Sequence, residues 1–207
     1  MFALNLPDFE YKIREHAGKK QIFDPMRRKF VSLTPEEWVR QHFTNYLIKY
    51  KGFPGGLMTN ECVINVNGQK KRCDTVLFDN TLKPLLIIEY KAPNITVSQT
   101  VFNQIATYNW VLKVKYLIVS NGLNHYCCRI DYDNQKVLYL KEIPNYIDLE
   151  IQIRINQQKS HPFPEMALKI IMNKTYASPS SFVNSESIII RPQYSQTITF
   201  LPIRISI

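Results

Sequence analysis

Apolar side chains recur at helical spacing after Thr34 and predict the first long helix of the chain. Thr34 is a favourable N-cap residue, Pro35 suits the first helical position, and Glu37 stands where it completes a capping box. The helix is predicted to end at Gly52, because a Gly- and Pro-rich stretch follows. Its apolar stripe consists of Val39, Phe43, Tyr46, Leu47 and Tyr50.

A β-hairpin is predicted for the next segment. Residues 61–66 and 69–78 form two extended runs, and Asn67-Gly68 between them is the strongest two-residue turn signal, because both positions need positive φ. The apolar run at residues 85–88 predicts a third strand that is buried on both faces of its sheet. Three consecutive strands therefore follow the first helix.

The second half of the pattern predicts a crossover. Residues 98–113 have the apolar spacing of a helix, and residues 116–120 read as another buried strand. Because a helix separates this strand from the one before it, the two are expected to be parallel and joined by a right-handed connection. Residues 125–130 and 136–140 look like a closing hairpin. The fold class is therefore α/β, with a mixed sheet flanked by helices.

Both ends of the chain differ from this central region. Residues 1–30 are interpreted as a lead-in of short strand or loop, whose basic residues are either a solvated surface or an arm that contacts phosphate. We expect a domain at residues 31–148 and a tail of uncertain order at residues 149–207, which is poorly ordered or a peripheral appendage. Within the tail the pattern suggests a short helix at Met166–Asn173 and short strands at Ile188–Ile190 and Ile198–Ile207.

Composition narrows the choice of function. The 207 residues carry 26 Lys and Arg against 17 Asp and Glu, and this net charge of +9 favours polyanionic partners such as nucleic acid. The four cysteines form no CxxC pair, which argues against a zinc site and a disulfide scaffold. No apolar run is long enough for a membrane helix and no signal peptide is recognised, so we expect a cytoplasmic protein without a membrane partner.

Three charged residues near the buried third strand are candidates for chemistry. Glu89 and Lys91 follow Leu85 and Ile87 on one face of that strand, where a charge is costly unless it is paired or binds metal. Asp74 lies on the preceding strand, and the connecting hairpin brings it beside Glu89. Two adjacent carboxylates repel each other, and Mg²⁺, or Mn²⁺ in its place, would remove that conflict. Singly, each of the three is more simply a surface charge; together they suggest phosphodiester hydrolysis assisted by a lysine.

The spacing of these residues carries a resemblance. Asp74, fourteen intervening residues and Glu89-Tyr90-Lys91 resemble the PD-(D/E)xK nuclease signature, although Cys73 stands where that signature has proline. Three segments are similar to the nuclease domain at the N-terminus of type I restriction enzyme R subunits, and in particular to its small stand-alone bacterial members. These segments are residues 34–41, 72–76 and 88–93, and the resemblance covers about residues 25–145. It implies a restriction-endonuclease-like αβββαβ core.

The resemblance also implies roles for individual residues. Asp74 and Glu89 correspond to the metal-binding pair, the carbonyl of Tyr90 to a further ligand, and Lys91 to the catalytic lysine. The implied activity is that of a Mg²⁺-dependent deoxyribonuclease in bacterial defence, of the restriction–modification type.

Accessory residues are less sharply defined. Gln104 and Tyr108 match a QxxxY motif of some branches and, four residues apart, share one face of the second helix. The alternative is a surface glutamine and a core tyrosine. The resemblance also implies an acid on the first helix, for which Glu36 and Glu37 compete. We prefer Glu36, because the capping box already explains Glu37.

The two-residue turn fixes a register for the hairpin. If residues 67 and 68 form the whole loop, Glu61 faces Asp74 and Cys62 faces Cys73. Glu61 would then join the acidic cluster, and the two cysteines would remain free thiols.

The function predicted from the sequence is metal-dependent cleavage of DNA. Lys70, Lys71 and Arg72 near the hairpin tip are candidates for nucleic-acid binding, with a solvated tip as the alternative. No GxxxxGK[ST] motif occurs, so no ATP-driven motor is predicted, and helicase or specificity subunits would act in trans. Two rival functions remain: a nucleic-acid-binding module without turnover, and a nuclease subunit that depends on a partner.

Overall fold

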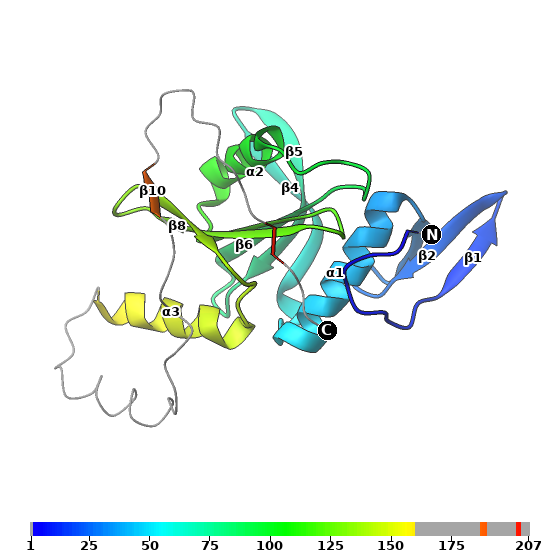
Figure 1. The fold of residues 1–207 in the computed structure, drawn as a ribbon, viewed down its shortest axis with the longest axis horizontal. Coiled ribbons are helices and arrows are strands. Elements are labelled where there is room, and N and C mark those ends of the chain that lie inside the picture. The colour runs from blue at the N-terminus through cyan, green and yellow to red at the C-terminus, as the bar shows by residue number, and fades with distance from the viewer. Residues whose placement is uncertain (1, 160–186, 190–201, 204–207) are drawn as a thin grey trace.

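A mixed seven-stranded sheet forms the centre of the molecule in the order β10-β9-β8-β7-β6-β5-β4 (Figure 1). The computed structural model describes residues 2–159, 187–189 and 202–203. No helix within these ranges is long and apolar enough to cross a membrane. The strands are β4 (Met58–Val66), β5 (Gln69–Phe78), β6 (Pro84–Tyr90), β7 (Tyr116–Ser120), β8 (His125–Asp131), β9 (Lys136–Leu140) and β10 (Ser187–Ile189).

Helix α1 (Pro35–Lys51) forms where the sequence predicted it. The N–H of Glu37 donates to the hydroxyl of Thr34, and Gly52 ends the helix in the left-handed region with φ +70°. The capping box itself was a wrong prediction. The N–H of Thr34 donates to the carbonyl of Ser32, and the Glu37 carboxylate is buried among arginines instead.

The hairpin of β4 and β5 confirms the predicted turn and register. Asn67 and Gly68 both have positive φ, which is the requirement that made this pair a turn signal. Cys62 lies directly opposite Cys73, and both are free cysteines. A short 3-10 turn, η1 (Gly55–Leu57), leads from α1 into β4.

The predicted crossover is also confirmed. Helix α2 (Gln99–Leu112) connects β6 to β7, and the two strands pair in parallel from Leu86 and Tyr116 onward. Strands β7, β8 and β9 then pair antiparallel, as the closing-hairpin prediction required. The order α1-β4-β5-β6-α2-β7 is thus the αβββαβ order expected from the sequence.

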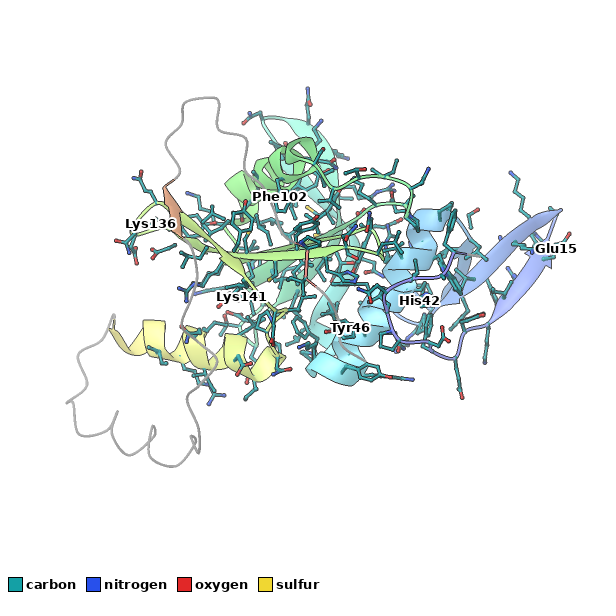
Figure 2. The ribbon with its side chains drawn as sticks, in the orientation of Figure 1. Glu15, His42, Tyr46, Phe102, Lys136 and Lys141 are labelled. Atoms are coloured by element: carbon teal, nitrogen blue, oxygen red, sulfur yellow. The ribbon has the colours of Figure 1, made fainter. Side chains whose placement is uncertain are left out.

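Helices cover both faces of this sheet. Tyr46 of α1 and Phe102 of α2 approach it from opposite sides in Figure 2. The α1 side packs against Leu86, Ile88 and Tyr90, and the α2 side against Ile87 and its neighbours. Strand β6 therefore alternates between two apolar cores, which explains why its sequence is apolar on both faces.

The lead-in at residues 1–30 is more ordered than the sequence predicted. Strands β1 (Ile13–His16), β2 (Lys19–Asp24) and β3 (Lys29–Ser32) form a separate three-stranded antiparallel sheet. This sheet extends from α1 away from the main sheet, at the right of Figure 1. The expectation of a short strand or loop was correct in part: the segment forms three short strands, and the mostly polar sequences of β1 and β2 give little apolar signal.

A third helix crosses the domain boundary expected at residue 148. Helix α3 (Tyr146–Lys159) buries Leu149 in the core on the α1 side of the sheet. Asn145 precedes it, and its backbone N–H donates to the Asp148 carboxylate, which is half of a capping box. This Asn-x-x-Asp pattern is a sequence signal for the start of the helix.

The tail is described only in part. Strand β10 (Ser187–Ile189) pairs with β9 and overlaps the strand expected at Ile188–Ile190. Ile203 forms an isolated antiparallel bridge with His125 inside the range expected to hold the last strand. The helix expected at Met166–Asn173 lies outside the described residues.

Candidate functional site

Asp74 and Glu89 lie opposite each other where two central strands separate. The ladder between β5 and β6 ends at the pair Thr75 and Ile88, so both acids are one residue beyond it. Asp74 Oδ2 accepts a hydrogen bond of 2.8 Å from the N–H of Tyr90. The structure therefore brings together the two carboxylates that the sequence predicted to be neighbours.

Glu89 is the most deeply buried acid of the site. Its Oε1 accepts hydrogen bonds from Lys91 Nζ at 2.6 Å and from Gln104 Nε2 at 2.7 Å. Its Oε2 is buried and has no hydrogen-bond partner. Burial, and then the negative charge of Asp74, raise the pKa of Glu89 to about 7. One oxygen of Glu89 is thus placed for a positively charged ligand that the protein itself does not supply.

Lys91, Gln104 and Tyr108 hold the other oxygen of Glu89 in place. Gln104 Nε2 bridges Glu89 and the Tyr108 hydroxyl, which is 3.0 Å away, so the two α2 residues share one face as expected. Burial alone would lower the pKa of Lys91, but its hydrogen bond to Glu89 and the charge of that carboxylate raise it. Lys91 is therefore a cation next to the carboxylate pair.

Tyr90 contributes its backbone N–H to the site, and its ring lies 5.7 Å from the Arg40 guanidinium. Its side chain is fully buried, its hydroxyl lies 3.3 Å from that of Thr44, and its ring packs edge-on against Phe43. The side chain therefore belongs to the core on the α1 side, while the backbone N–H donates to Asp74.

Of the two competing acids on α1, Glu36 is the one whose charge interacts with both members of the carboxylate pair. Burial and then the charge of Asp74 raise the pKa of Glu36, while Lys91 and Arg40 oppose that rise. The Glu36 side chain is 42% exposed to solvent. Glu37 points instead into a buried cluster with two arginines. The two neighbouring acids thus occupy different environments.

Two arginines that the sequence analysis did not single out connect the acids. Arg40 Nη2 lies 3.4 Å from Asp74 Oδ1, and Arg40 Nη1 lies 2.8 Å from Glu37 Oε2. Arg27 Nη2 lies 2.7 Å from Glu37 Oε1, and Arg27 also pairs with the buried Asp24. A continuous chain of ion pairs therefore runs from the β2–β3 turn to Asp74.

Glu61 lies opposite Asp74, as the hairpin register predicted, but its described ion pairs are with arginines rather than with the site carboxylates. The pairs on either side of it in the ladder place it opposite Asp74, and its φ is +57°. Its Oε1 lies 3.0 Å from Arg27 Nη1 and 3.6 Å from Arg40 Nη1, and its Oε2 lies 3.7 Å from Arg72 Nη1. Glu61 is therefore neutralised by arginines and has no contact with Glu89 among the described ion pairs and hydrogen bonds.

The basic residues of the hairpin tip lie apart from the carboxylates. Lys70, Lys71 and Arg72 are exposed near the turn between β4 and β5, and Arg72 alone reaches the network, through Glu61. These three positive charges are thus exposed on β5, the strand that also carries Asp74.

The donor set suits a hard cation that keeps much of its water. Within the described residues no group of three or more His, Cys, Asp or Glu side chains could hold a metal ion. The donors of the carboxylate pair are oxygens, and of the four only Glu89 Oε2 has no hydrogen-bond partner. Mg²⁺ binds through one or two carboxylates and retains several waters, so these donors and the unpartnered Glu89 oxygen fit it.

The element order and the position of the site define an α/β domain of restriction-endonuclease type. The family model for the N-terminus of the type I restriction enzyme R protein matches residues 35–144. The chain belongs to this family. The matched range runs from the start of α1 to the residues just before α3 and contains every candidate site residue named from the sequence.

Similar solved structures include two restriction-enzyme proteins. One is a fragment described as a candidate HsdR subunit of a type I restriction enzyme from Vibrio vulnificus YJ016, with 21% identity, a TM-score of 0.44 and 58% of this chain covered. This chain covers only 25% of that one. The other is the type IIG restriction endonuclease BpuSI, with 16% identity, a TM-score of 0.33, and coverage of 50% of this chain and 12% of BpuSI. No curated protein sequence matches the chain.

Proposed function

We propose that the chain is a metal-dependent nuclease that hydrolyses DNA phosphodiester bonds, of the restriction and defence type. The observation that carries this proposal is the buried, unpartnered Oε2 of Glu89 beside Asp74, with the Lys91 ammonium on the other Glu89 oxygen. A buried carboxylate oxygen without a partner is costly unless a cation binds it. The family match supports the restriction-enzyme context.

Each residue has a defined role in this proposal. Asp74 and Glu89 hold Mg²⁺ together with the carbonyl of Tyr90, and Mn²⁺ substitutes for it. The metal supplies Lewis acidity at the phosphate and a more acidic bound water. Lys91 orients the attacking water and offsets the negative charge that develops on the phosphate. Gln104, held by Tyr108, keeps the Glu89 carboxylate in position through its hydrogen bond of 2.7 Å.

A second candidate function is a nucleic-acid-binding module without turnover of its own, or a subunit whose activity requires a helicase or specificity partner. The observation that favours it concerns Asp74. Both of its oxygens already have protein partners, the N–H of Tyr90 on Oδ2 and the Arg40 guanidinium on Oδ1. A metal would compete with Arg40 for Oδ1, and a partner could shift that competition.

A cleavage assay separates these functions. Supercoiled plasmid and single-stranded DNA are incubated with the full chain in Mg²⁺, in Mn²⁺ and in EDTA. We expect cutting with either metal, and a loss of about a hundredfold or more in Asp74→Asn, Glu89→Gln and Lys91→Gln. Asp133→Asn and Lys141→Gln remove the same charges at exposed positions away from the site and should cut normally. No cutting by the folded wild type would contradict the nuclease proposal, and cutting only after a partner is added would favour the dependent subunit.

Metal binding is tested without activity. The melting temperature of the full chain is followed as Mn²⁺ is added, because a ligand that binds the native state alone stabilises it by about 2.7 kcal/mol at a hundred times its Kd. We expect this stabilisation in the wild type and its loss in Asp74→Asn. Equal stabilisation of both proteins would place the ion elsewhere.

A further inference from the structure

The three-stranded sheet of β1, β2 and β3 has two chemically different faces. Ile22 and Asp24 of β2 are fully buried, so the face that carries them packs onto the body of the protein. Side chains alternate along a strand, which places Lys19 and Phe23 on the opposite, outer face. The cross-strand pairs Arg14 with Gln21 and His16 with Lys19 put the basic residues of β1 on that outer face as well.

The acids of this sheet lie on one face and not on the other. On the inner face each lysine has an acid as its cross-strand neighbour: Lys20 is opposite Glu15, and Lys29 is opposite Asp24. The outer face pairs Arg14 with an amide and Lys19 with an imidazole. Throughout residues 12–32, which the structure describes completely, no carboxylate lies on the outer face.

Aromatic rings lie between these cations. Phe23 and Phe30 are cross-strand partners with ring centroids 5.3 Å apart, and both are partly exposed. The Arg14 guanidinium lies 4.0 Å from the centre of the Phe30 ring, and its Nε donates to Gln21 Oε1 at 2.8 Å. These two contacts hold the guanidinium in a fixed place on the surface, which lowers the entropy cost of using it to bind an anion.

The base of this sheet adjoins the candidate site. The β2–β3 turn carries Arg27, which pairs with Glu37 and Glu61, and Glu37 is linked through Arg40 to Asp74. The other end projects outward, with Glu15 at the far right of Figure 2. A linear polyanion on the outer face would therefore lead towards the carboxylate pair.

Lys12 lies beside Phe23 of the outer face, because its carbonyl accepts a hydrogen bond of 2.9 Å from the N–H of Phe23. We propose that the outer face of this sheet, formed by Lys12, Arg14, Lys19, Phe23 and Phe30, binds the phosphate backbone of a nucleic-acid strand. The inference rests on the proposed function in its choice of ligand and adds a contact surface outside the carboxylate site. Basic residues interleaved with aromatic rings suit a nucleic-acid strand, since the cations meet phosphates and the rings meet bases or sugars. An anionic membrane would use the cations alone and give no reason for the position beside the site.

A matched pair of double variants tests this surface. Lys12→Gln with Lys19→Gln removes two exposed lysines from the outer face, and Lys20→Gln with Lys29→Gln removes two exposed lysines from the inner face of the same sheet. Binding of a fluorescent duplex and of a single strand of equal length is measured in EDTA across a salt series. We expect the outer variant to bind about tenfold more weakly and the slope of log K against log salt to shrink by about 1.4 to 1.8. The inner variant should bind within about twofold of wild type, because its lysines already face acids.

Two comparisons test the inference: duplex against single-stranded DNA, and the outer-face variant against the inner-face variant. Equal loss on the duplex and on the single strand would assign the two lysines to the phosphate backbone, which both DNA forms share. Equal weakening by both variants, or binding of the outer face to anionic phospholipid vesicles but not to DNA, would overturn the inference. The binding assay contains EDTA, so its result does not depend on hydrolysis. A chain that binds DNA through the outer face in EDTA but does not cut DNA in Mg²⁺ or Mn²⁺ would refute the nuclease proposal and leave this inference standing.

Discussion

At the scale of single residues, Arg40 explains how buried acids persist next to the candidate site. Its side chain is buried, and one guanidinium contacts both Glu37 and Asp74, while its Nε has no partner. Glu37 in turn is held by Arg27 from another element. A buried acid of this kind depends on its partners, since an unpaired charge in the interior is costly.

Replacing Arg40 with glutamine should therefore destabilise the protein. The change leaves Asp74 and Glu37 with one cation fewer, and we expect a loss of about 3 kcal/mol in the free energy of unfolding. This value is at the lower end of the range for a broken buried ion pair, because Arg27 still pairs with Glu37. Urea unfolding measures this loss. Arg154→Gln is the control: that side chain is 72% exposed and pairs with Glu150 at 3.8 Å, so its removal should cost less than about 0.5 kcal/mol.

His125 is a second residue whose environment predicts behaviour. Its Nε2 lies 3.1 Å from the carbonyl of Asn5, which can only accept, so Nε2 carries the hydrogen and Nδ1 accepts from the Ser120 hydroxyl at 2.8 Å. Burial lowers the pKa of His125 to about 4, although the hydrogen bond to Asn5 opposes this shift. The ring is therefore neutral in the folded protein and fills part of the core.

Stability should fall with acidification because of His125. His125 takes up a proton near pH 6.5 in the unfolded chain and only near pH 4 in the folded chain. Its contribution to the free energy of unfolding is therefore fully present above pH 6.5 and is lost as the pH falls towards 4. At pH 5 this amounts to about 2 kcal/mol relative to pH 7.5. Urea unfolding at the two pH values should show a smaller difference in His125→Gln and an unchanged one in His16→Gln, whose side chain is exposed. The same pH difference in all three proteins would contradict this assignment.

At the scale of elements, local signals in the sequence predicted most of the main sheet. The Asn67-Gly68 turn fixed the register of β4 and β5, and the apolar run in β6 predicted burial on both faces. The three-stranded sheet of the lead-in was missed because β1 and β2 are mostly polar, although Ala17-Gly18, both with positive φ, is a two-residue hairpin turn. Polar strands depend on a neighbouring surface, which an apolar pattern does not reveal.

Turn glycines give a graded prediction at this scale. Gly122, between β7 and β8, has φ +82°, and an added Cβ would lie 2.7 Å from Leu4 and 2.9 Å from Val39. Gly68 has φ +79° but open space around it, and Gly56 has open space without a positive φ. We expect Gly56→Ala to be near neutral, Gly68→Ala to cost about 1 kcal/mol, and Gly122→Ala to cost about 2 to 4 kcal/mol. Thermal melts rank the three, and a Gly122→Ala cost no larger than that of Gly68→Ala would show that the N-terminal segment does not pack there.

At the scale of the whole molecule, the site shows where sequence reasoning stops. Asp74, Glu89 and Lys91 could be predicted, because strand alternation and one hairpin suffice to bring them together. The partners Arg27 and Arg40 could not, because they reach the acids from separate elements and give no periodic signal. The same limit hid α3, because its apolar residues recur at every second position, as in a strand, although the segment packs onto the sheet as a helix.

The packing of α3 decides whether the domain ends near residue 148, as the sequence suggested, or includes this helix. Leu149 is 1% exposed within the core, whereas Ile147, two residues earlier on the same helix, is 57% exposed. If α3 is part of the domain, Leu149→Ala should cost about 3 kcal/mol and Ile147→Ala less than about 0.5 kcal/mol in urea unfolding. Small and equal losses in the two variants would support a domain that ends near residue 148. In a helix that does not pack against the sheet, truncating Leu149 would cost no more than truncating Ile147.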